Sequence, residues 1–324
     1  MKMLSSGAMA LGLAVALASA AHSQERYPQR PIRWVVPNPA GGGTDATVRL
    51  MASFMHGVLG QPLVIDNKPG AATMIGTDTV ARSRPDGYTL LTGDNATFAT
   101  NMLLYKKVPY DPVKDFRYVA QTTRLPLALV TRKDFPAKTL QELIAYAKAH
   151  PAKINFATPG QGLPHHLAME LLMQQTDTRL THVAYKGSPA AVQDVMGGQI
   201  DIMFLDLASG MPLIKEGRVQ VLGIASLKRF EGLPDMPTLS EQGLDQFEVY
   251  AWQGVVVPAG TPDVVVNRLN QALQQTLENP EVRRKMLAIG VEPTWSGAQQ
   301  FAQHAGAERA RWSRLIAAKG LKLE

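Results

Sequence analysis

The chain has 324 residues, of which 45% are hydrophobic and 19% are charged, and its formal net charge is +6. It contains no cysteine, which excludes thiol nucleophiles, cysteine-ligated zinc and iron–sulfur clusters. Its lysines and arginines are scattered, whereas a nucleic-acid-binding protein clusters them beside exposed aromatic residues. We therefore expect no nucleic-acid partner and interpret the basicity as favouring solubility and anionic ligands.

The first residues have the layout of a secretory signal peptide. Lys2 gives a positive start, an apolar run covers residues 9–20, and small residues follow, so we expect cleavage after Ala20 or Ser23. The apolar run is shorter than the roughly 18–20 residues that a membrane span needs, which argues against an uncleaved anchor. Removal of residues 1–23 takes away Lys2, which lowers the formal charge of +6 by one, to +5, and yields an exported protein.

From residue 31 onwards, runs rich in strand-forming residues alternate with runs of helical periodicity. Strands are predicted at 32–36, 62–67, 88–93, 127–132, 153–158, 180–185, 200–206, 219–226 and 247–258. Helices are predicted at 45–60, 74–83, 139–150, 164–176, 188–198, 261–279, 280–289 and 297–318, and a further helix ends at 215–217. This alternation is typical of an α/β fold, in which helices cover both faces of a parallel sheet.

The predicted elements form two α/β units. The second unit, residues 126–249, is inserted into the first, which comprises residues 24–125 plus 250–324. The chain crosses between them at residues 121–130 and 247–256, and neither crossing has the glycine- and serine-rich composition of a linker. We therefore expect both crossings to be strands that the two lobes share.

The first junction between a predicted strand and a predicted helix, PNPAGGGTD at 37–45, has the composition of an anion-binding turn. Such junctions meet at one edge of a parallel sheet, where ligands bind. Glycines let a ligand approach the backbone, and free N–H groups at a helix start attract anions. The pattern is neither a P-loop nor Gly-x-Gly-x-x-Gly, and a tight turn with an aspartate cap explains it equally well. The candidate binding residues are Ala40, Gly41, Gly42, Gly43, Thr44 and Asp45.

Four further junctions are small and polar, and each contains glycine. They lie at 92–101, 157–166, 185–188 and 205–210. Their candidate binding residues are Asp94, Asn95, Thr158, Gly160, Gly162, His165, Tyr185, Lys186 and Asp206. Five such junctions at one edge of the sheet favour a ligand site over five unrelated turns.

Catalytic interpretations of the same residues are weaker. Asp45, Asp94 and Asp206 have the chemistry of general acids or bases, but aspartate is also favoured at helix caps and turns, which is the better interpretation here. His165 and His166 point about 100° apart on a helix and cannot easily ligate one metal. The sequence contains neither His-Glu-x-x-His nor Gly-x-Ser-x-Gly, so we expect no metal, no cofactor and no catalytic residue.

Five long segments carry a family resemblance. YPQRPIRWVVPNPAGGGTD, GQPLVIDNKPGAATMIGTDTVARSRPDGYTLL, LLYKKVPYDPVKDF, HVAYKGSPAAVQDVMGGQIDIMF and DMPTLSEQGL resemble the substrate-binding receptors of tripartite tricarboxylate transporters, the Bug-type receptors of bacteria. The resemblance implies a two-lobed periplasmic binding protein of type II, a monomer that captures a small carboxylate for a pair of membrane permease subunits. It also implies that the loops at 41–45 and 158–165 grip one carboxylate through backbone N–H groups, hydroxyls and waters.

Three departures from the family pattern bear on the ligand. The usual Pro-Pro-Gly-Gly-Ser-Thr-Asp lacks one hydroxyl at 39–45, and Leu163 and Pro164 replace small or hydroxyl residues. The usual Phe-Asp-Asn becomes Leu205, Asp206 and Leu207 after a phenylalanine. We therefore expect a ligand with an apolar or aromatic body and a second polar group near Asp206. A sensor that reports to a signalling protein stays an alternative, as does an exported hydrolase or lyase.

Overall fold

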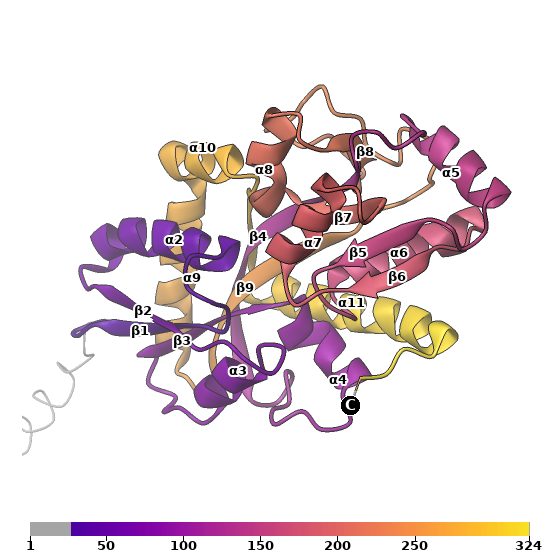
Figure 1. The fold of residues 1–324 in the computed structure, drawn as a ribbon. Coiled ribbons are helices and arrows are strands. Elements are labelled where there is room, and N and C mark those ends of the chain that lie inside the picture. Colours follow the sequence, from indigo (N-terminus) through magenta and orange to yellow (C-terminus); the bar gives the residue numbers. More distant parts are fainter. Residues whose placement is uncertain (1–26, 324) are drawn as a thin grey trace, which may run out of the picture.

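The computed structural model describes residues 27–323, so the predicted signal peptide at 1–23 and its two cleavage sites lie outside the described residues. The described chain forms two lobes that lie side by side and share long strands (Figure 1). Within residues 27–323, no helix is both long enough and apolar enough to cross a membrane.

The strands of the described chain pair into one ten-stranded sheet. They are β1 (Ile32–Val36), β2 (Leu63–Asn67), β3 (Thr89–Asp94), β4 (Phe116–Thr131), β5 (Asn155–Thr158), β6 (Thr181–Ala184), β7 (Ile202–Asp206), β8 (Gln220–Ile224), β9 (Tyr250–Pro258) and β10 (Glu292–Gly297). Neighbours follow the order β2-β1-β3-β9-β4-β7-β5-β6, while β8 and β10 both pair with β4. In each lobe three strands are parallel, β1 to β3 in the first and β5 to β7 in the second. Their strand-to-helix junctions therefore meet at one edge of each lobe.

The longest strand, β4, joins the two lobes. Its residues up to Pro126 pair antiparallel with β9, and its residues from Leu127 pair antiparallel with β7 and β8. The predicted crossing at 121–130 therefore lies inside one continuous strand, and the predicted crossing at 247–256 overlaps β9. The exact bounds of the two domains stay a prediction.

Helices cover both faces of the sheet (Figure 1). They are α2 (Gly43–Leu59), α3 (Met74–Ala81), the π-helical turn η1 (Ala96–Thr100), α4 (Asn101–Leu104), α5 (Leu140–Ala149), α6 (Pro164–Thr176), α7 (Ser188–Met196), α8 (Leu207–Lys215), α9 (Asp263–Glu278), α10 (Pro280–Ala288) and α11 (Ala298–Lys319). In the first lobe, α2 and α9 pack on one face and α3, η1 and α11 on the other. In the second lobe, α5 and α6 lie opposite α7 and α8. This arrangement confirms the predicted α/β class.

The helix after β1 shows how sequence periodicity positions the site. Val48, Met51 and Met55 are fully buried in the core shared with β1 and α9. Their three- and four-residue spacing is that of one helix face. Gly60 ends α2 with a left-handed φ of 71°. Because the buried face anchors α2 on the sheet, its first turn is held at the carboxyl end of β1.

Two segments differ from the sequence pattern. Residues 92–101, expected as a polar junction, continue from β3 into helical turns, because Asp94 Oδ1 accepts a hydrogen bond from Thr97 N at 3.0 Å and caps the first turn. Residues 292–297 form β10, where no strand was predicted. Proline and glycine in this segment hide the strand period, yet Pro293 lies opposite Thr123 in the pairing with β4.

The C-terminal helix contacts both lobes. Near the start of α11, Phe301 is buried in the first-lobe core together with Trp252. Near its end, Trp312 and Ile316 belong to the second-lobe core together with Phe247. The helix therefore completes the core of the second lobe although its chain enters from the first.

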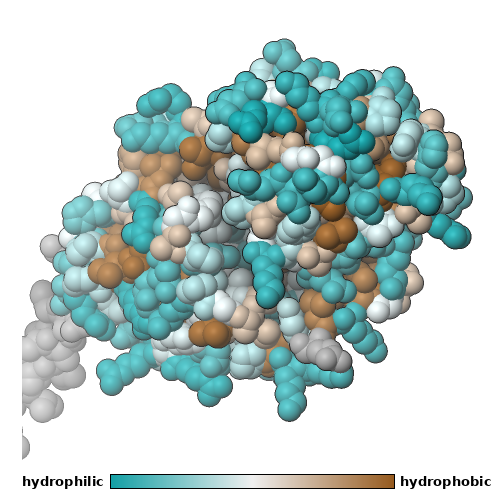
Figure 2. Space-filling view, viewed as in Figure 1, coloured by the Kyte–Doolittle hydropathy of each residue, from teal (hydrophilic) through white to brown (hydrophobic). Residues whose placement is uncertain are grey.

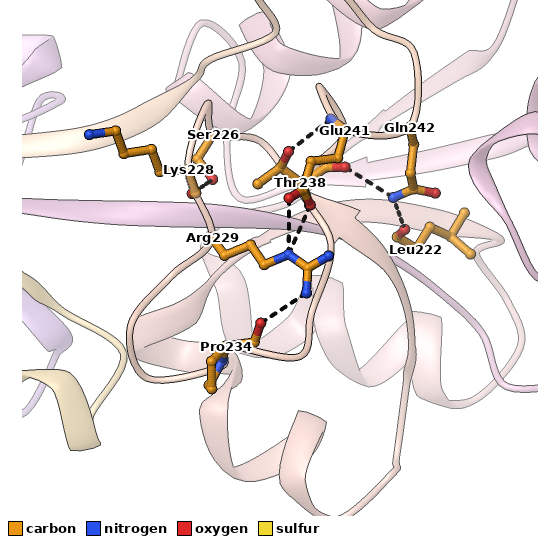
Figure 3. Close-up of polar contacts among 8 residues, drawn as sticks. All are labelled: Leu222, Ser226, Lys228, Arg229, Pro234, Thr238, Glu241 and Gln242. Carbon is orange, nitrogen blue, oxygen red and sulfur yellow. Dashed lines mark hydrogen bonds and ion pairs between the residues drawn. The ribbon is translucent and has the colours of Figure 1, made fainter.

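A long connection between β8 and β9 is held by polar contacts within the second lobe (Figure 3). Arg229 Nε donates to both carboxylate oxygens of Glu241 at 3.0 Å, and Arg229 Nη1 donates to Pro234 O at 3.1 Å. Glu241 and Thr238 each accept a hydrogen bond from the other's backbone N–H group. The next residue, Gln242, donates from Nε2 to the carbonyl of Leu222 in β8 at 2.7 Å. These bonds keep the connection folded against its own lobe.

Candidate functional site

The glycine-rich junction forms an exposed loop that ends in the start of a helix. Gly41 has a left-handed φ of 79°, which glycine adopts without strain, and Gly42 is the N-cap of α2 without a side-chain cap bond. The first bond of the helix runs from Ala46 N to Gly42 O at 3.0 Å. The N–H groups of Gly43 and Thr44 precede that bond, so they are among the free donors of the helix start.

The carboxylate of Asp45 holds this loop in place through hydrogen bonds. Its Oδ2 accepts hydrogen bonds from Gly41 N and Arg49 Nε, both at 2.9 Å, and its Oδ1 accepts one from Asn67 Nδ2 at 3.0 Å. Burial opposes ionisation, but the bonds from Arg49, Gly41 and Asn67 hold the pKa of Asp45 below its usual value. The carboxylate therefore fixes the loop and also neutralises Arg49, the cation nearest to it in sequence.

Thr44 is held by a residue that the sequence analysis did not select. Gln253 of β9 is buried, and its Nε2 donates to Thr44 Oγ1 at 2.7 Å. Its Oε1 accepts a hydrogen bond from Thr123 Oγ1 at 3.3 Å. Gln253 lies opposite Asp94 in the pairing of β9 with β3, so it reaches the same edge as the first loop. Only the strand pairing identifies it, because the sequence does not specify which strand lies next to β3.

Asp94 and Asn95 serve the first lobe itself. Asp94 Oδ1 accepts from the Oγ1 of Thr97 as well as from its N–H group, both at 3.0 Å, and burial raises the pKa of Asp94. Asn95 Oδ1 accepts from Trp252 N at 2.8 Å, which ties the end of β3 to β9. These two predicted residues lie at the correct edge, but their polar atoms are occupied by neighbouring backbone and hydroxyl groups.

A strained turn after β2 was missed by the sequence analysis. Ala71, Ala72 and Thr73 have φ values of 46°, 49° and 73°, a left-handed region that residues other than glycine rarely adopt. Asn101 Nδ2 donates to Ala72 O at 2.8 Å, and Thr73 Oγ1 lies 3.1 Å from Thr97 Oγ1. These bonds hold the turn in place beside the Asp94 network. Two alanines and a threonine carry no sequence signal for this conformation.

In the second lobe, the glycine loop between β5 and α6 is fixed by two histidines. Thr158 is fully buried, with its Oγ1 2.7 Å from His182 Nε2. Gly162 has a φ of 76°, and its N–H group donates to His166 Nδ1 at 3.1 Å. A Cβ on Gly162 would lie 2.3 Å from Leu104 Cδ1 of α4, and the left-handed φ of Gly162 also favours glycine. The loop also contains Gly160, where a Cβ would meet only Leu163 of the same loop.

The polar groups of the junction after β6 are directed to α7 and to the surface. The Tyr185 hydroxyl donates a hydrogen bond to Asp194 Oδ2 of α7 at 2.5 Å, and burial together with this bond raises the pKa of Tyr185 to about 12. The neighbouring Lys186 is exposed. Tyr185 therefore braces α7, and Lys186 lies on the surface.

His165 and Asp206 meet at the starts of two helices. Asp206 is the N-cap of α8, and its Oδ1 accepts from Ser209 N at 2.8 Å. His165, in the first turn of α6, places Nε2 3.4 Å from Asp206 Oδ2. Burial opposes ionisation of Asp206, but His165 and Ser209 hold its pKa below the usual value. Within the described chain, His165 Nδ1 is buried and has no hydrogen-bond partner.

Three helix starts meet at this place. A Cβ on Gly43, in the first turn of α2, would lie 3.4 Å from the Cβ of Ala208 in the first turn of α8. The cap of α8 in turn contacts the first turn of α6 through the pair of His165 and Asp206. The space-filling view shows the surface hollowed between the two lobes (Figure 2). Helix starts carry partial positive charge, so their meeting point attracts an anion without a lysine or arginine.

The two-lobed α/β architecture and this inter-lobe site define the class of solute-binding proteins. The chain belongs to the tripartite tricarboxylate transporter receptor family, whose model (TctC, Tripartite tricarboxylate transporter family receptor) matches residues 47–321. The family resemblance stated from the sequence motifs is thereby confirmed.

Three solved structures are similar over nearly the whole chain. R. palustris Rpa4515 with adipate has a TM-score of 0.84 and 33% identity, and the match covers 91% of this chain and 99% of that one. The periplasmic binding protein BugD has a TM-score of 0.80 and 35% identity, with 92% and 100% covered. MatC from Rhodopseudomonas palustris with bound malate has a TM-score of 0.78 and 34% identity, with 90% and 100% covered. These likenesses confirm the two-lobed fold and a carboxylate-binding receptor family with periplasmic members.

Proposed function

We propose that this chain is a periplasmic receptor that captures a small organic carboxylate between its lobes and presents it to the membrane permease subunits of a tripartite tricarboxylate-type transporter. The observation that carries the proposal is the meeting of the first turns of α2, α6 and α8. Relatives whose structures hold adipate and malate support the ligand class. A receptor of this kind binds and releases its ligand, so we expect no turnover.

The grip on the carboxylate comes from neutral donors. The N–H groups of Gly43 and Thr44 on one side, and those of His165 and Ala208 on the other, belong to helix starts that flank the hollow. Hydrogen bonds from such donors to a charged acceptor are stronger than bonds between neutral groups, at about 1.5–3 kcal/mol each. Each helix start adds roughly 0.3–1 kcal/mol of favourable electrostatic energy.

The candidate residues divide into contacts and supports. We assign the contacts to Ala40, Gly41, Gly42, Gly43, Thr44, Gly160, Gly162, His165 and Asp206. The supports, whose polar atoms hold the loops through the bonds described above, are Asp45, Asp94, Asn95, Thr158 and Tyr185. Lys186 lies at the exposed rim, where it attracts anions at long range without gripping them.

Substitution of Gly43 tests the site directly. Gly43→Val is expected to abolish carboxylate binding. The added Cβ would lie 3.4 Å from Ala208 Cβ, and the two methyl groups of valine would extend further into the space between the helix starts. Calorimetry on ligand-free protein measures the loss. Gly57→Val, in the same helix with nothing within 4 Å of its Cβ, is the control and is expected to bind as the unaltered protein does. Normal binding by Gly43→Val would refute the assigned site.

The transport role needs a separate experiment. Cells that carry the permease genes but lack this receptor are expected to take up the bound acid only when complemented with the unaltered chain, and not with Gly43→Val. Uptake that is independent of the receptor would favour the sensory alternative.

A further inference from the structure

We propose that Asp206 fixes the tautomer of His165 so that Nδ1 is a hydrogen-bond acceptor facing the ligand, and that the ligand is therefore a carboxylate that also bears a hydroxyl or ammonium donor. The inference rests on the proposed function, because it assigns the second polar group of the same ligand. It makes His165 and Asp206 a pair that determines specificity.

The starting observation is a buried nitrogen without a partner. His165 is 8% exposed, and in residues 27–323 its Nδ1 meets no hydrogen-bond partner. The other buried side-chain atoms in this condition lie on β4, β10 and α11: Gln121 Nε2, Arg124 Nε, Trp295 Nε1, Ser296 Oγ and His304 Nε2. His165 is set apart from them because it lies in the first turn of α6, where three helix starts meet. A buried polar atom without a protein partner at a ligand site is a candidate to bind a polar group of the ligand.

Asp206 decides which ring nitrogen carries the proton. Its Oδ1 already accepts from Ser209 N, and its Oδ2 lies 3.4 Å from His165 Nε2. An ionised carboxylate only accepts hydrogen bonds, so in the tautomer that pairs with Asp206 the imidazole donates from Nε2 and keeps the lone pair on Nδ1. The adjacent His166 shows this acceptor role fulfilled, since its Nδ1 accepts from Gly162 N at 3.1 Å.

An acceptor at this position selects the second group of the ligand. A hydroxyl or an ammonium donates to Nδ1, whereas a second carboxylate has no proton to donate and would approach the negative Asp206. The other charged or titratable groups around α6 are already engaged. His166 Nε2 lies 3.6 Å from Glu170, Lys319 of α11 lies 2.9 Å from the same carboxylate, and His182 of β6 stacks on His166 at 4.2 Å. They leave Asp206 as the carboxylate that contacts His165.

The test compares matched acids on ligand-free protein. Calorimetry would use butyrate, 2-, 3- and 4-hydroxybutyrate, the three aminobutyrates and succinate, with benzoate, its hydroxy and amino derivatives and terephthalate as an aromatic set. At least one hydroxy or amino acid is expected to bind roughly tenfold or more tightly than its unsubstituted parent, because the parent leaves the acceptor unpaired. Comparison of the hydroxy acids with the amino acids shows whether a hydroxyl or an ammonium group is the preferred donor. Equal affinities across each set, or tightest binding of a dicarboxylate, would overturn the inference.

Asp206→Asn reverses the polarity of the pair. The amide can donate to Nε2, which moves the imidazole proton to Nδ1 and turns that atom into a donor. Asparagine is also a good helix N-cap, so α8 keeps its start. The preference for hydroxy or amino acids is expected to fall at least tenfold, in favour of succinate or terephthalate. Asp177→Asn, at the opposite end of α6, is the control and should leave the preference unchanged.

A spectroscopic readout separates this inference from the proposed function. Imidazole ¹⁵N NMR of the ligand-free chain should show His165 protonated at Nε2, and at Nδ1 in Asp206→Asn. Protonation at Nδ1 in the unaltered chain would overturn the inference. If carboxylic acids of both sets bind but hydroxy and amino groups make no difference, the inference fails and the carboxylate receptor stands. If no acid binds, the proposed function fails as well.

Discussion

The polar side-chain atoms of Asp45, Asp94 and Thr158 form hydrogen bonds within or next to their own loops. Asp45 binds Gly41 N, Asp94 binds the first turn of η1, and the Thr158 hydroxyl lies against His182. Loops held in this way keep their free N–H groups in place before a ligand arrives. Less conformational entropy is then lost on binding, which favours affinity without a charged side chain.

At the residue scale, His182, which contacts the second-lobe loop, makes the stability of the fold depend on pH. Its ring stacks against Phe156, at 4.8 Å between ring centroids, and against His166, at 4.2 Å. Burial, with a smaller contribution from the charge of His166, lowers the pKa of His182 from 6.5 to about 4. The folded protein then binds fewer protons at this site than the unfolded chain does, so this contribution to stability is complete above pH 6.5 and is lost as the pH falls towards 4.

We expect the thermal unfolding temperature to decrease as the pH is lowered from 6.5 to 4. The decrease should be smaller in His182→Gln, because glutamine stays neutral and can still bond Thr158. Calorimetric or circular-dichroism melting over that range measures the slope. His56→Gln, at an exposed position on α2, is the control and should keep the full slope. Equal slopes in the two variants would show that another group carries the acid dependence.

At the scale of elements, periodicity in the sequence predicted most strands and helices, because buried apolar faces such as that of Val48, Met51 and Met55 leave a regular pattern. It also predicted the glycine loops at the strand ends. Gln253 could not be predicted, because its role depends on β9 lying beside β3. The left-handed turn at 71–73 was also hidden, since its conformation is imposed by contacts with Thr97 and Asn101 and is not a preference of its own residues.

Gly290 marks a contact between elements of different lobes. It precedes β10 with a φ of 77°, and a Cβ there would lie 2.3 Å from Leu207 O and 2.8 Å from Met211 Cγ of α8. Gly290→Ala should push the connection between α10 and β10 away from α8, destabilise the fold by about 1–3 kcal/mol, the usual cost of overpacking, and weaken ligand binding.

Small-angle scattering with saturating acid checks this directly, because a wedge between the lobes increases the radius of gyration. Gly217→Ala has the same left-handed strain, with a φ of 62°, but nothing lies within 4 Å of its Cβ. It should lose some stability and keep the compact profile. An unchanged profile in Gly290→Ala would mean that the connection yields without moving the lobe.

At the scale of the whole molecule, the two lobes are linked by the continuous strand β4, by β9 and by the helix α11, which packs into both cores. Paired strands that cross between lobes are suited to bending as hinges around a ligand. The meeting of α2, α6 and α8 depends on how the lobes sit together, which no local pattern encodes. The sequence could therefore supply the loops of the site but not their geometry.

The most direct test of a carboxylate held by helix starts is calorimetry with an acid and its amide. The acid chosen for this test is the one that binds most tightly among the butyrate and benzoate sets. Its amide has nearly the same shape but carries no charge. We expect the amide to bind roughly 100-fold more weakly, about 2.7 kcal/mol, because charge-assisted bonds and the helix dipoles act only on the anion. Equal binding of the acid and the amide would contradict the carboxylate site formed by α2, α6 and α8.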